Sequence, residues 1–297
     1  MKRLHVPPGW GNSGFVIVIP AQNEALRLPV ALGAFARDGK ARDIIVVANG
    51  CTDATASIAR RYPELPVAVL ETARLAGGVG EARRLGLQAA LRVAPQTEIV
   101  ATSDADCVVM PGWARIVLAS LSRADVVCGR VVPDPVEFAR LPRLVRYHGV
   151  LEDRVSALEA ELQGLRSPVI HDPLPRHNQT LGASLAFRTD AYLRAGGFEA
   201  IPCHEDHRLV DRIEAAGGRI ARPWKLTVTA SCRLLGRAPG GMADTIADRT
   251  TRPAHLTAET GRLAWRARKL YRAITVYDAV PQPYPTMEET TDVLSLR

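Results

Sequence analysis

The sequence has 297 residues, 47% of them hydrophobic, which is enough apolar material for one large core or for one core with an appendage. Lys and Arg number 38 against 31 Asp and Glu, for a formal net charge of +7. The arginines concentrate in the last quarter with few interleaved aromatic side chains, so we expect no nucleic-acid partner. The five cysteines are widely spaced without a C-x-x-C pair, which indicates a reducing compartment.

Hydrophobic segments long enough to enter a membrane are not found in the sequence. No run approaches the ~18 apolar residues that would span a bilayer, and the N-terminus lacks the apolar stretch of a signal peptide. We therefore expect a cytoplasmic protein that meets its substrates in water or peripherally at the inner membrane surface.

The first hundred residues alternate between strand and helix patterns. Residues 15–19 and 44–48 are continuous apolar, β-branched runs, typical of fully buried parallel strands. A strand over 67–70, a helix over about 79–93 and a strand over 98–102 continue the alternation. Repeated β-α-β units predict an α/β fold with a mostly parallel central sheet and helices on both faces.

The rest of the chain is less regular. In chain order we expect a strand over 125–132, a helix over 144–162, a loop over 167–179, a strand over 184–187, a helix over 205–216, short strands within 219–230 and a basic helix over about 254–273. We predict a first domain over residues 1–235, with an irregular segment at about 133–179. We expect residues 236–297 to form a C-terminal lid and a basic helical extension.

Two carboxylates directly follow the strand over 98–102. In parallel sheets, ligands sit beyond the carboxyl ends of the strands, and Asp104-Ala105-Asp106 lies there. Hard oxygen ligands suit Mg²⁺ or Mn²⁺. The two acids would repel each other with nothing in the sequence to neutralise both, so a bound cation is the economical explanation. The alternative is a pair of turn-capping aspartates.

Six short motifs, in this order and spacing, make the chain resemble the family 2 glycosyltransferases, which have the GT-A fold. The matching stretches are 15–24, 45–55, 77–83, 103–106, 196–198 and 204–209. Their span covers roughly the first 235 residues. The resemblance implies transfer of a sugar from a nucleotide-diphosphate sugar to an acceptor.

The resemblance also implies a set of donor-side residues. They are Pro20, Gln22, Glu24, Asn49, Gly50, Asp53, Gly78, Arg83, Asp104, Ala105, Arg233 and Arg237. Many relatives place an aspartate at the position of Asn49, and an amide donates as well as accepts, so the donor base stays open. A UDP-sugar is favoured, with GDP- and dTDP-sugars as alternatives. Asn49-Gly50 as a simple turn is the other interpretation.

Glycines and arginines form two further candidate phosphate contacts. Gly77-Gly78-Val79-Gly80 would let the backbone approach a ligand, with Arg83 reaching the diphosphate. The alternative is a loop entering a helix, with Arg83 on a solvated face. The segment 233–241 pairs Arg233 and Arg237 with glycines, which suggests a lid that closes on phosphate oxygens, or else a disordered linker.

Glu205-Asp206 resembles the acidic pair that the family places at the start of a helix. The resemblance implies that Asp206 acts as general base on the acceptor hydroxyl, with Glu205 beside it, and that direct displacement inverts the anomeric centre. The helix N-terminus keeps the carboxylate ionised. An ordinary helix-end charge is the alternative. Retaining enzymes exist in related GT-A families, so the stereochemistry stays open.

The third metal ligand is not evident from the sequence. Relatives often supply a histidine after the later strands, where this chain reads Thr229-Ala230-Ser231-Cys232-Arg233. Water, His207 or no protein group would then complete the coordination of the metal.

Two rival functions remain. One is a nucleotidyltransferase that makes sugar nucleotides, which would normally carry a Gly-, Arg- and Lys-containing loop after the first strand, unlike residues 20–24. The other is a catalytically inactive domain that binds nucleotide-sugars, which the intact Asp104, Asp106 and Asp206 disfavour. Transmembrane helices and the Q-x-x-R-W motif of processive synthases are absent from the sequence. We expect a small molecule, a glycan or a lipid head group as acceptor, and leave a homodimer open.

Overall fold

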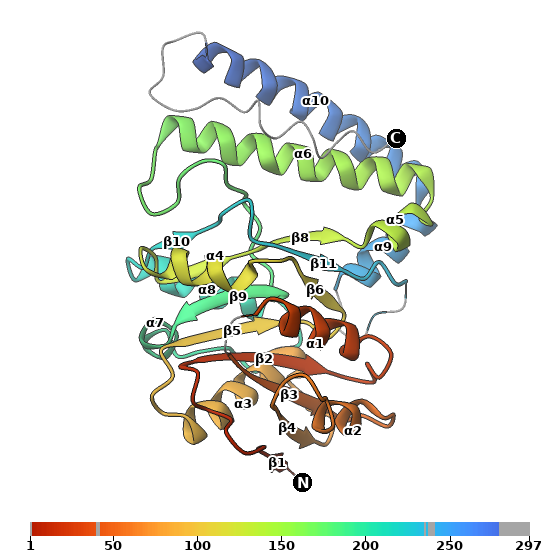
Figure 1. Cartoon of the computed structure of the whole chain (residues 1–297). Helices are drawn as coiled ribbons and strands as arrows, with labels where there is room; N and C mark the ends of the chain where they lie inside the picture. The colour runs from red at the N-terminus through yellow and green to blue at the C-terminus, as the bar shows by residue number, and fades with distance from the viewer. Residues whose placement is uncertain (1, 40–41, 235, 237–240, 279–297) are drawn as a thin grey trace.

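A computed structural model describes residues 2–39, 42–234, 236 and 241–278, and it is built around an eight-stranded sheet (Figure 1). In spatial order the strands are β1 (Arg3–His5), β4 (Val67–Thr72), β3 (Asp43–Asn49), β2 (Phe15–Ala21), β5 (Ile99–Ser103), β9 (Ser184–Arg188), β7 (Val126–Cys128) and β10 (Ile220–Ala221). β2 to β5 are mutually parallel, whereas β1 and β9 run antiparallel to their neighbours. The predicted mostly parallel sheet is confirmed.

The central strands are apolar on both sides because helices cover both faces. Phe15, Ile17 and Ile19 pack with α1 (Leu28–Arg37), α2 (Thr55–Arg60) and α4 (Trp113–Leu121). Val16 and Val18, which point the other way, pack with α3 (Gly78–Val93), α7 (Thr189–Arg194) and α8 (Glu205–Ala215). The period-2 alternation of strand side chains therefore builds two cores, one on each face of the sheet.

A second, three-stranded sheet continues from the carboxyl edge of the first. Its order is β6 (Cys107–Val109), β11 (Thr227–Ala230) and β8 (Arg130–Pro133), with β11 antiparallel to β6 and parallel to β8. Because β6 follows β5 after only three residues, the turn Asp104–Asp106 joins the two sheets.

A long helix pair covers one side of the molecule (Figure 1). α5 (Pro135–Ala139) leads into α6 (Arg143–Arg166), and α9 (Met242–Thr251) leads into α10 (Pro253–Asp278), which lies along α6. Small apolar clusters hold the pair together, for example Leu158 and Leu162 with Ile274. The predicted helix over 144–162 is thus present and longer, and it fills much of the segment 133–179 that we described as irregular.

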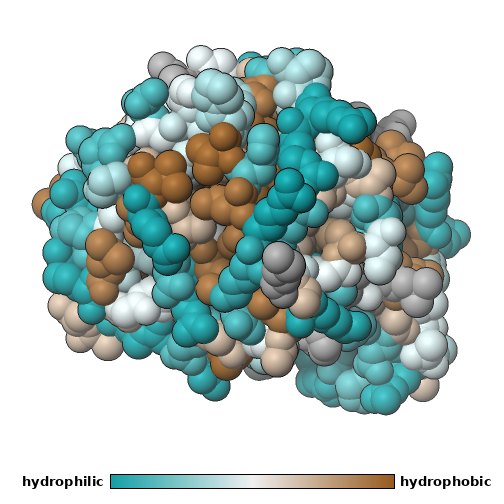
Figure 2. Space-filling model, turned by 90° about the horizontal axis from the view of Figure 1, so that it is seen from below, coloured by the Kyte–Doolittle hydropathy of each residue, from teal (hydrophilic) through white to brown (hydrophobic). Residues whose placement is uncertain are grey.

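Surface features add two observations. Within the part of the chain that the structure describes, no helix combines the length and apolar character needed to cross a bilayer. Seen from the side that carries β1 and β4, hydrophobic side chains gather in a patch bordered by hydrophilic ones (Figure 2).

Candidate functional site

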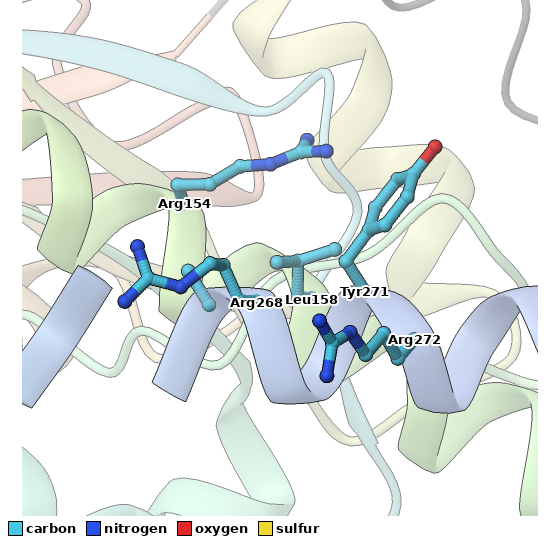
Figure 3. Close-up of a pocket in the computed structure, with 6 residues that line it drawn as sticks. Arg154, Leu158, Arg268, Tyr271 and Arg272 are labelled. Atoms are coloured by element: carbon cyan, nitrogen blue, oxygen red, sulfur yellow. The ribbon is translucent and has the colours of Figure 1, made fainter. Parts of the chain in front are cut away.

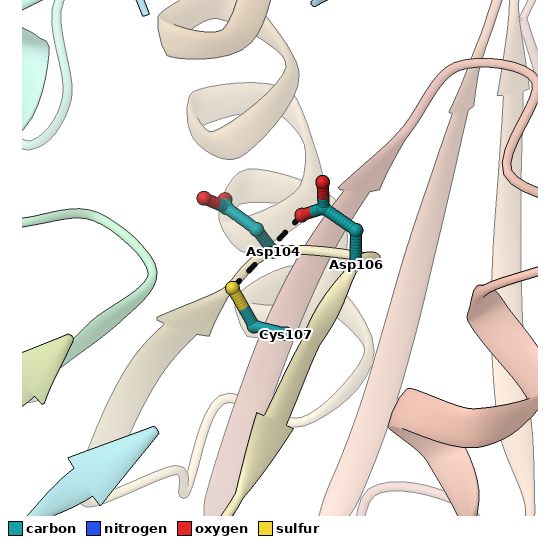
Figure 4. Close-up of side chains that lie close together, drawn as sticks. All are labelled: Asp104, Asp106 and Cys107. Carbon is teal, nitrogen blue, oxygen red and sulfur yellow. Dashed lines mark hydrogen bonds between the residues drawn. The ribbon is translucent and has the colours of Figure 1, made fainter. Parts of the chain in front are cut away.

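Asp104 and Asp106 form a cluster with Cys107 at the carboxyl end of β5 (Figure 4). Their ligand atoms all lie within 4.8 Å of one another. Burial raises the pKa of the Cys107 thiol well above its ordinary value, and hard cations such as Mg²⁺ and Mn²⁺ prefer oxygen ligands to sulfur. The two carboxylates are then the groups suited to a metal, and oxygen donors of this kind fit Mg²⁺ or Mn²⁺.

The electrostatics of Asp106 also favour a bound cation. Its side chain is 17% exposed, and burial followed by the charge of Asp104 raises the pKa of the Asp106 carboxyl to about 6. A buried carboxylate beside another carboxylate is unfavourable, and a divalent cation shared between them would relieve that repulsion. The residues present therefore fit the expected metal.

The expectation that nothing in the sequence neutralises both aspartates is wrong. Arg83 Nη2 lies 2.6 Å from Asp104 Oδ1, and Arg233 Nη2 lies 3.0 Å from Asp106 Oδ2. Arg233 also donates from Nη1 to Glu24 Oε1 at 2.7 Å. Each aspartate thus has its own arginine, and repulsion between the acids alone does not require a metal.

Arg83 is the centre of a buried ionic network. Its side chain is 4% exposed, and it donates to Thr102 Oγ1 at 2.9 Å, to Asp104 at 2.6 Å and to Glu205. Burial alone would lower the pKa of Arg83, but Asp104, Glu205 and Asp206 raise it above its ordinary value, so the group is always charged. The alternative of Arg83 on a solvated face is wrong.

The two acids at the start of α8 have different surroundings. Glu205 is buried against Arg83, and burial is the main cause that raises the pKa of its carboxyl. Asp206 is half-buried, and its Oδ2 accepts a 2.7 Å hydrogen bond from the backbone N–H of Gly182. Of this pair, only Asp206 is partly exposed to solvent.

Gly182 is a residue that the sequence analysis missed. A Cβ at this position would lie less than 3.0 Å from the guanidinium of Arg83, which three acceptors hold in place. Glycine is therefore needed for Arg83 and Asp206 to occupy the same corner. Its only sequence signal was a glycine two residues before the strand over 184–187.

The glycines at the start of α3 pack against protein backbone. A Cβ at Gly77 would lie 2.7 Å from the carbonyl oxygen of Ala200. Gly78 has φ +58°, and a Cβ there would lie 2.9 Å from Pro202 Cα. The segment that precedes α8 accordingly lies against the start of α3, which provides a structural reason for these glycines other than the expected approach to a ligand. The donor contact of Gly78 stays a prediction.

Hydrogen bonds lock together the turns that follow β2 and β3. Asn23, with φ 54°, accepts from the N–H of Thr52 at 2.8 Å, and Asp53 Oδ2 accepts from the N–H of Ala25 at 3.1 Å. The N–H of Glu24 donates to Thr55 Oγ1 at 2.8 Å. These hydrogen bonds hold the two turns against each other, and the turns include the candidate donor residues Glu24 and Asp53.

The remaining candidate donor residues lie along the same edge. Asn49 is buried, and its Oδ1 accepts from the N–H of Leu75 at 2.8 Å. Gly50 has φ +60°, and a Cβ there would meet Arg74 Cα at 2.9 Å. Both residues hold the turn after β4. Pro20 and Gln22 are half-buried at the end of β2, and Ala105 is buried between the aspartates.

Two predicted residues stand apart from this group. His207 is exposed, and it does not belong to the Asp104, Asp106 and Cys107 cluster found among the described residues. Arg237 lies outside the residues that the structure describes. Arg233, the last residue of the stretch 229–233 where we looked for a histidine, places a guanidinium against Asp106.

The mixed sheet, its helices on both faces and the acidic turn after β5 define the GT-A fold of glycosyltransferases. Residues 16–185 match the model described as Glycosyl transferase family 2, so the chain belongs to this family. The resemblance drawn from the six motifs is thereby confirmed.

Solved structures agree with this fold. S. aureus TarS 1–349 in complex with UDP-GlcNAc is similar with a TM-score of 0.55 and 17% identity over 75% of this chain and 60% of that chain. The mannosyltransferase PcManGT from Pyrobaculum calidifontis, in complex with GDP-Man and Mn²⁺, is similar with a TM-score of 0.52 and 20% identity over 94% and 78%. The chain thus spans 60% of that TarS structure. No curated protein matches the sequence.

Proposed function

We propose that this protein transfers a sugar from a nucleotide-diphosphate sugar to an acceptor hydroxyl, with Asp104 and Asp106 holding Mg²⁺ or Mn²⁺. The observation that carries the proposal is the pair of carboxylates at the carboxyl end of β5, flanked by two arginines within 3.0 Å. Membership of family 2 supports the reaction class. A bound divalent cation supplies positive charge for the leaving nucleoside diphosphate.

Arg233 is the residue that we expect to pair with the diphosphate. Its guanidinium holds Asp106 and Glu24, and it is 20% exposed, so it lies at the surface of the site. Guanidinium groups match phosphate oxygens in bidentate geometry. Arg83 is buried and already donates to Thr102, Asp104 and Glu205, so we assign it the task of orienting Asp104.

Asp206 is the proposed general base. It lies in the first turn of α8, and its Oδ2 accepts a hydrogen bond from the N–H of Gly182, which holds the carboxylate in place. It would remove the proton of the acceptor hydroxyl as the hydroxyl attacks the anomeric carbon in line, which inverts that centre. Glu205 is a positioning residue that acts through Arg83.

The donor and acceptor are defined only as classes. TarS with UDP-GlcNAc and PcManGT with GDP-Man support a nucleotide-sugar donor, and we favour a UDP-sugar, with GDP- and dTDP-sugars as alternatives. For the acceptor we propose a hydroxyl of a small molecule, a glycan or a lipid head group.

A substitution at Asp206 tests the chemistry. Asp206→Asn keeps the shape of the side chain and its hydrogen-bonding oxygen but removes the base. We expect transfer to be abolished while binding of the nucleotide-sugar, followed by thermal shift, stays close to that of the wild type. Near wild-type turnover of this variant would exclude Asp206 as the base.

A further inference from the structure

A groove of about 280 Å³ lies between α6 and α10 of the long helix pair, and none of its lining residues belongs to the cluster of carboxylates (Figure 3). Arg154 and Leu158 of α6 line it, together with Ala267, Arg268, Tyr271 and Arg272 of α10. Leu158 and Ala267 provide an apolar floor, and three guanidinium groups surround it. A groove with this lining suits an anion that is attached to apolar material.

The guanidinium groups of this groove have no acidic partners within the part of the chain that the structure describes. Among the described residues, Arg154, Arg268 and Arg272 form no ion pair, whereas Arg266 on the same helix pairs with Glu159 at 2.5 Å. Lys269 lies over the ring of Trp265, 5.3 Å from its centroid, and pairs with no carboxylate of the described residues. Unlike the arginines of the active site, these cations are free for an external anion.

The composition of α10 reinforces this local excess of positive charge. From Thr260 to Tyr277 the helix carries five basic residues and no acidic one, and these are Arg262, Arg266, Arg268, Lys269 and Arg272. A helix face that is merely solvated normally mixes both signs of charge. The charge of this face is complementary to an extended anionic surface.

Exposed apolar side chains accompany the basic ones. Trp265, Lys269, Arg272 and Val276 recur at intervals of three or four residues, so they lie on one face of α10. Trp265 is 59% exposed and Val276 is 68% exposed. Tyr271, in the adjoining groove, is 56% exposed. Tryptophan and tyrosine favour the head-group region of a bilayer, and aliphatic side chains favour the layer beneath it.

We propose that this outer face of α10, together with the groove, docks the protein onto an anionic phospholipid membrane. Arg154, Arg268 and Arg272 bind head-group phosphates, and Trp265 and Val276 enter the interface. Basic charge alone would equally suit nucleic acid, but the exposed side chain of Val276, on the same face of α10 as Trp265, gains nothing from a phosphate backbone. The combination of apolar and basic side chains therefore favours the membrane.

Docking at this face has a structural connection to the active site. Cys232, next to Arg233, packs with Val145 of α6 and Leu256 of α10. The helix pair is thus in contact with the segment that positions the proposed diphosphate ligand Arg233. The inference goes beyond the proposed sugar transfer, and because binding to vesicles needs no donor, each proposal can fail without the other.

The test is sedimentation of the full chain with vesicles, in the absence of nucleotide-sugar. We expect binding to phosphatidylcholine vesicles that contain phosphatidylglycerol, little binding to phosphatidylcholine alone, and weakening by salt. The variant R268Q/K269Q/R272Q should bind about a hundredfold more weakly, since each basic residue near an anionic surface contributes about fivefold. Trp265→Ala should also weaken binding, without any change of charge.

A charge-matched control separates this surface from net charge. The variant R92Q/R115Q/R123Q removes three exposed arginines elsewhere and should bind the anionic vesicles nearly as well as the wild type. The proposal is overturned if the wild type does not bind anionic vesicles at low salt, or if the control loses as much affinity as the α10 variant. Tighter binding to RNA than to the vesicles, abolished by the α10 substitutions, would assign the surface to nucleic acid instead.

Discussion

Substitution of Glu205 by Gln tests whether the buried ionic network orients the metal-binding edge. The side chains of Arg83 and Glu205 are 4% and 2% exposed, so Gln leaves a buried guanidinium with one charged partner fewer. Breaking a buried ion pair costs about 3–5 kcal/mol. Gln can still accept a hydrogen bond and Asp104 remains as a counter-charge, so we expect the lower end, about 3 kcal/mol. At about 2 °C per kcal/mol for a large domain, this is about a 6 °C fall in melting temperature.

The assay for Glu205→Gln combines thermal unfolding with Mn²⁺ titration, and it has a matched control. Asp190→Asn breaks an exposed pair with Arg194, whose side chains are 50% and 67% exposed, and should shift melting by no more than about 2 °C. Because Arg83 would no longer orient Asp104 correctly, the affinity for Mn²⁺ should fall about tenfold or more, with transfer partly restored at saturating metal. A variant that melts like the control, keeps its Mn²⁺ affinity and yet loses transfer would instead make Glu205 a catalytic residue.

Three further substitutions test other parts of the structure. Gly182→Ala forces a Cβ against Arg83 and should lower the free energy of unfolding, measured by urea denaturation, by about 1–3 kcal/mol. An unchanged free energy of unfolding would contradict the close packing of Gly182 against Arg83. Arg233→Met should weaken donor binding, measured by calorimetry, by about 10- to 100-fold. Mn²⁺ alone should bind this variant at least as well as the wild type, because no guanidinium competes for Asp106. Unchanged donor affinity would exclude Arg233 from the diphosphate site. Burial, with Arg222 and Arg130, lowers the pKa of His177 from 6.5 to about 3, so the unfolded chain binds a proton that the folded chain excludes. The free energy of unfolding should therefore fall as the pH drops below about 6.5, by about 2 kcal/mol at pH 5. In His177→Asn, the urea midpoint should depend less steeply on pH. An equally steep dependence in the variant would assign the acid sensitivity to other groups.

Hydrophobic patterns in the sequence predicted the strands and helices that such patterns determine. The buried strands β2 and β3 were recognisable from continuous β-branched runs because helices cover both faces of the sheet. The position of Asp104 and Asp106 followed from the strand before them. The helix α6 was also found, although its predicted end at Leu162 falls four residues short of Arg166.

The ionic contacts of the site were beyond prediction because they join residues far apart in the chain. Nothing near Arg83 in the sequence shows that it is buried between Asp104 and Glu205, since this depends on how α3 packs against β5 and α8. The contact of Arg233 with Glu24 and Asp106 likewise depends on the course of the chain after β11. These contacts invalidated the argument from unneutralised acids, while the assignment of Asp104 and Asp106 as metal ligands stays a prediction.

The central claim is that Asp104 and Asp106 bind a divalent cation that holds the nucleotide-sugar. The most direct measurement is calorimetric titration of UDP-, GDP- and dTDP-sugars into the wild type and into the variant D104N/D106N, each with Mn²⁺ and with a chelator. The account predicts that at least one donor binds the wild type only with Mn²⁺ and that the double variant binds none of them in either condition. Donor binding that is equally tight with the chelator, or that survives in the double variant, would contradict it.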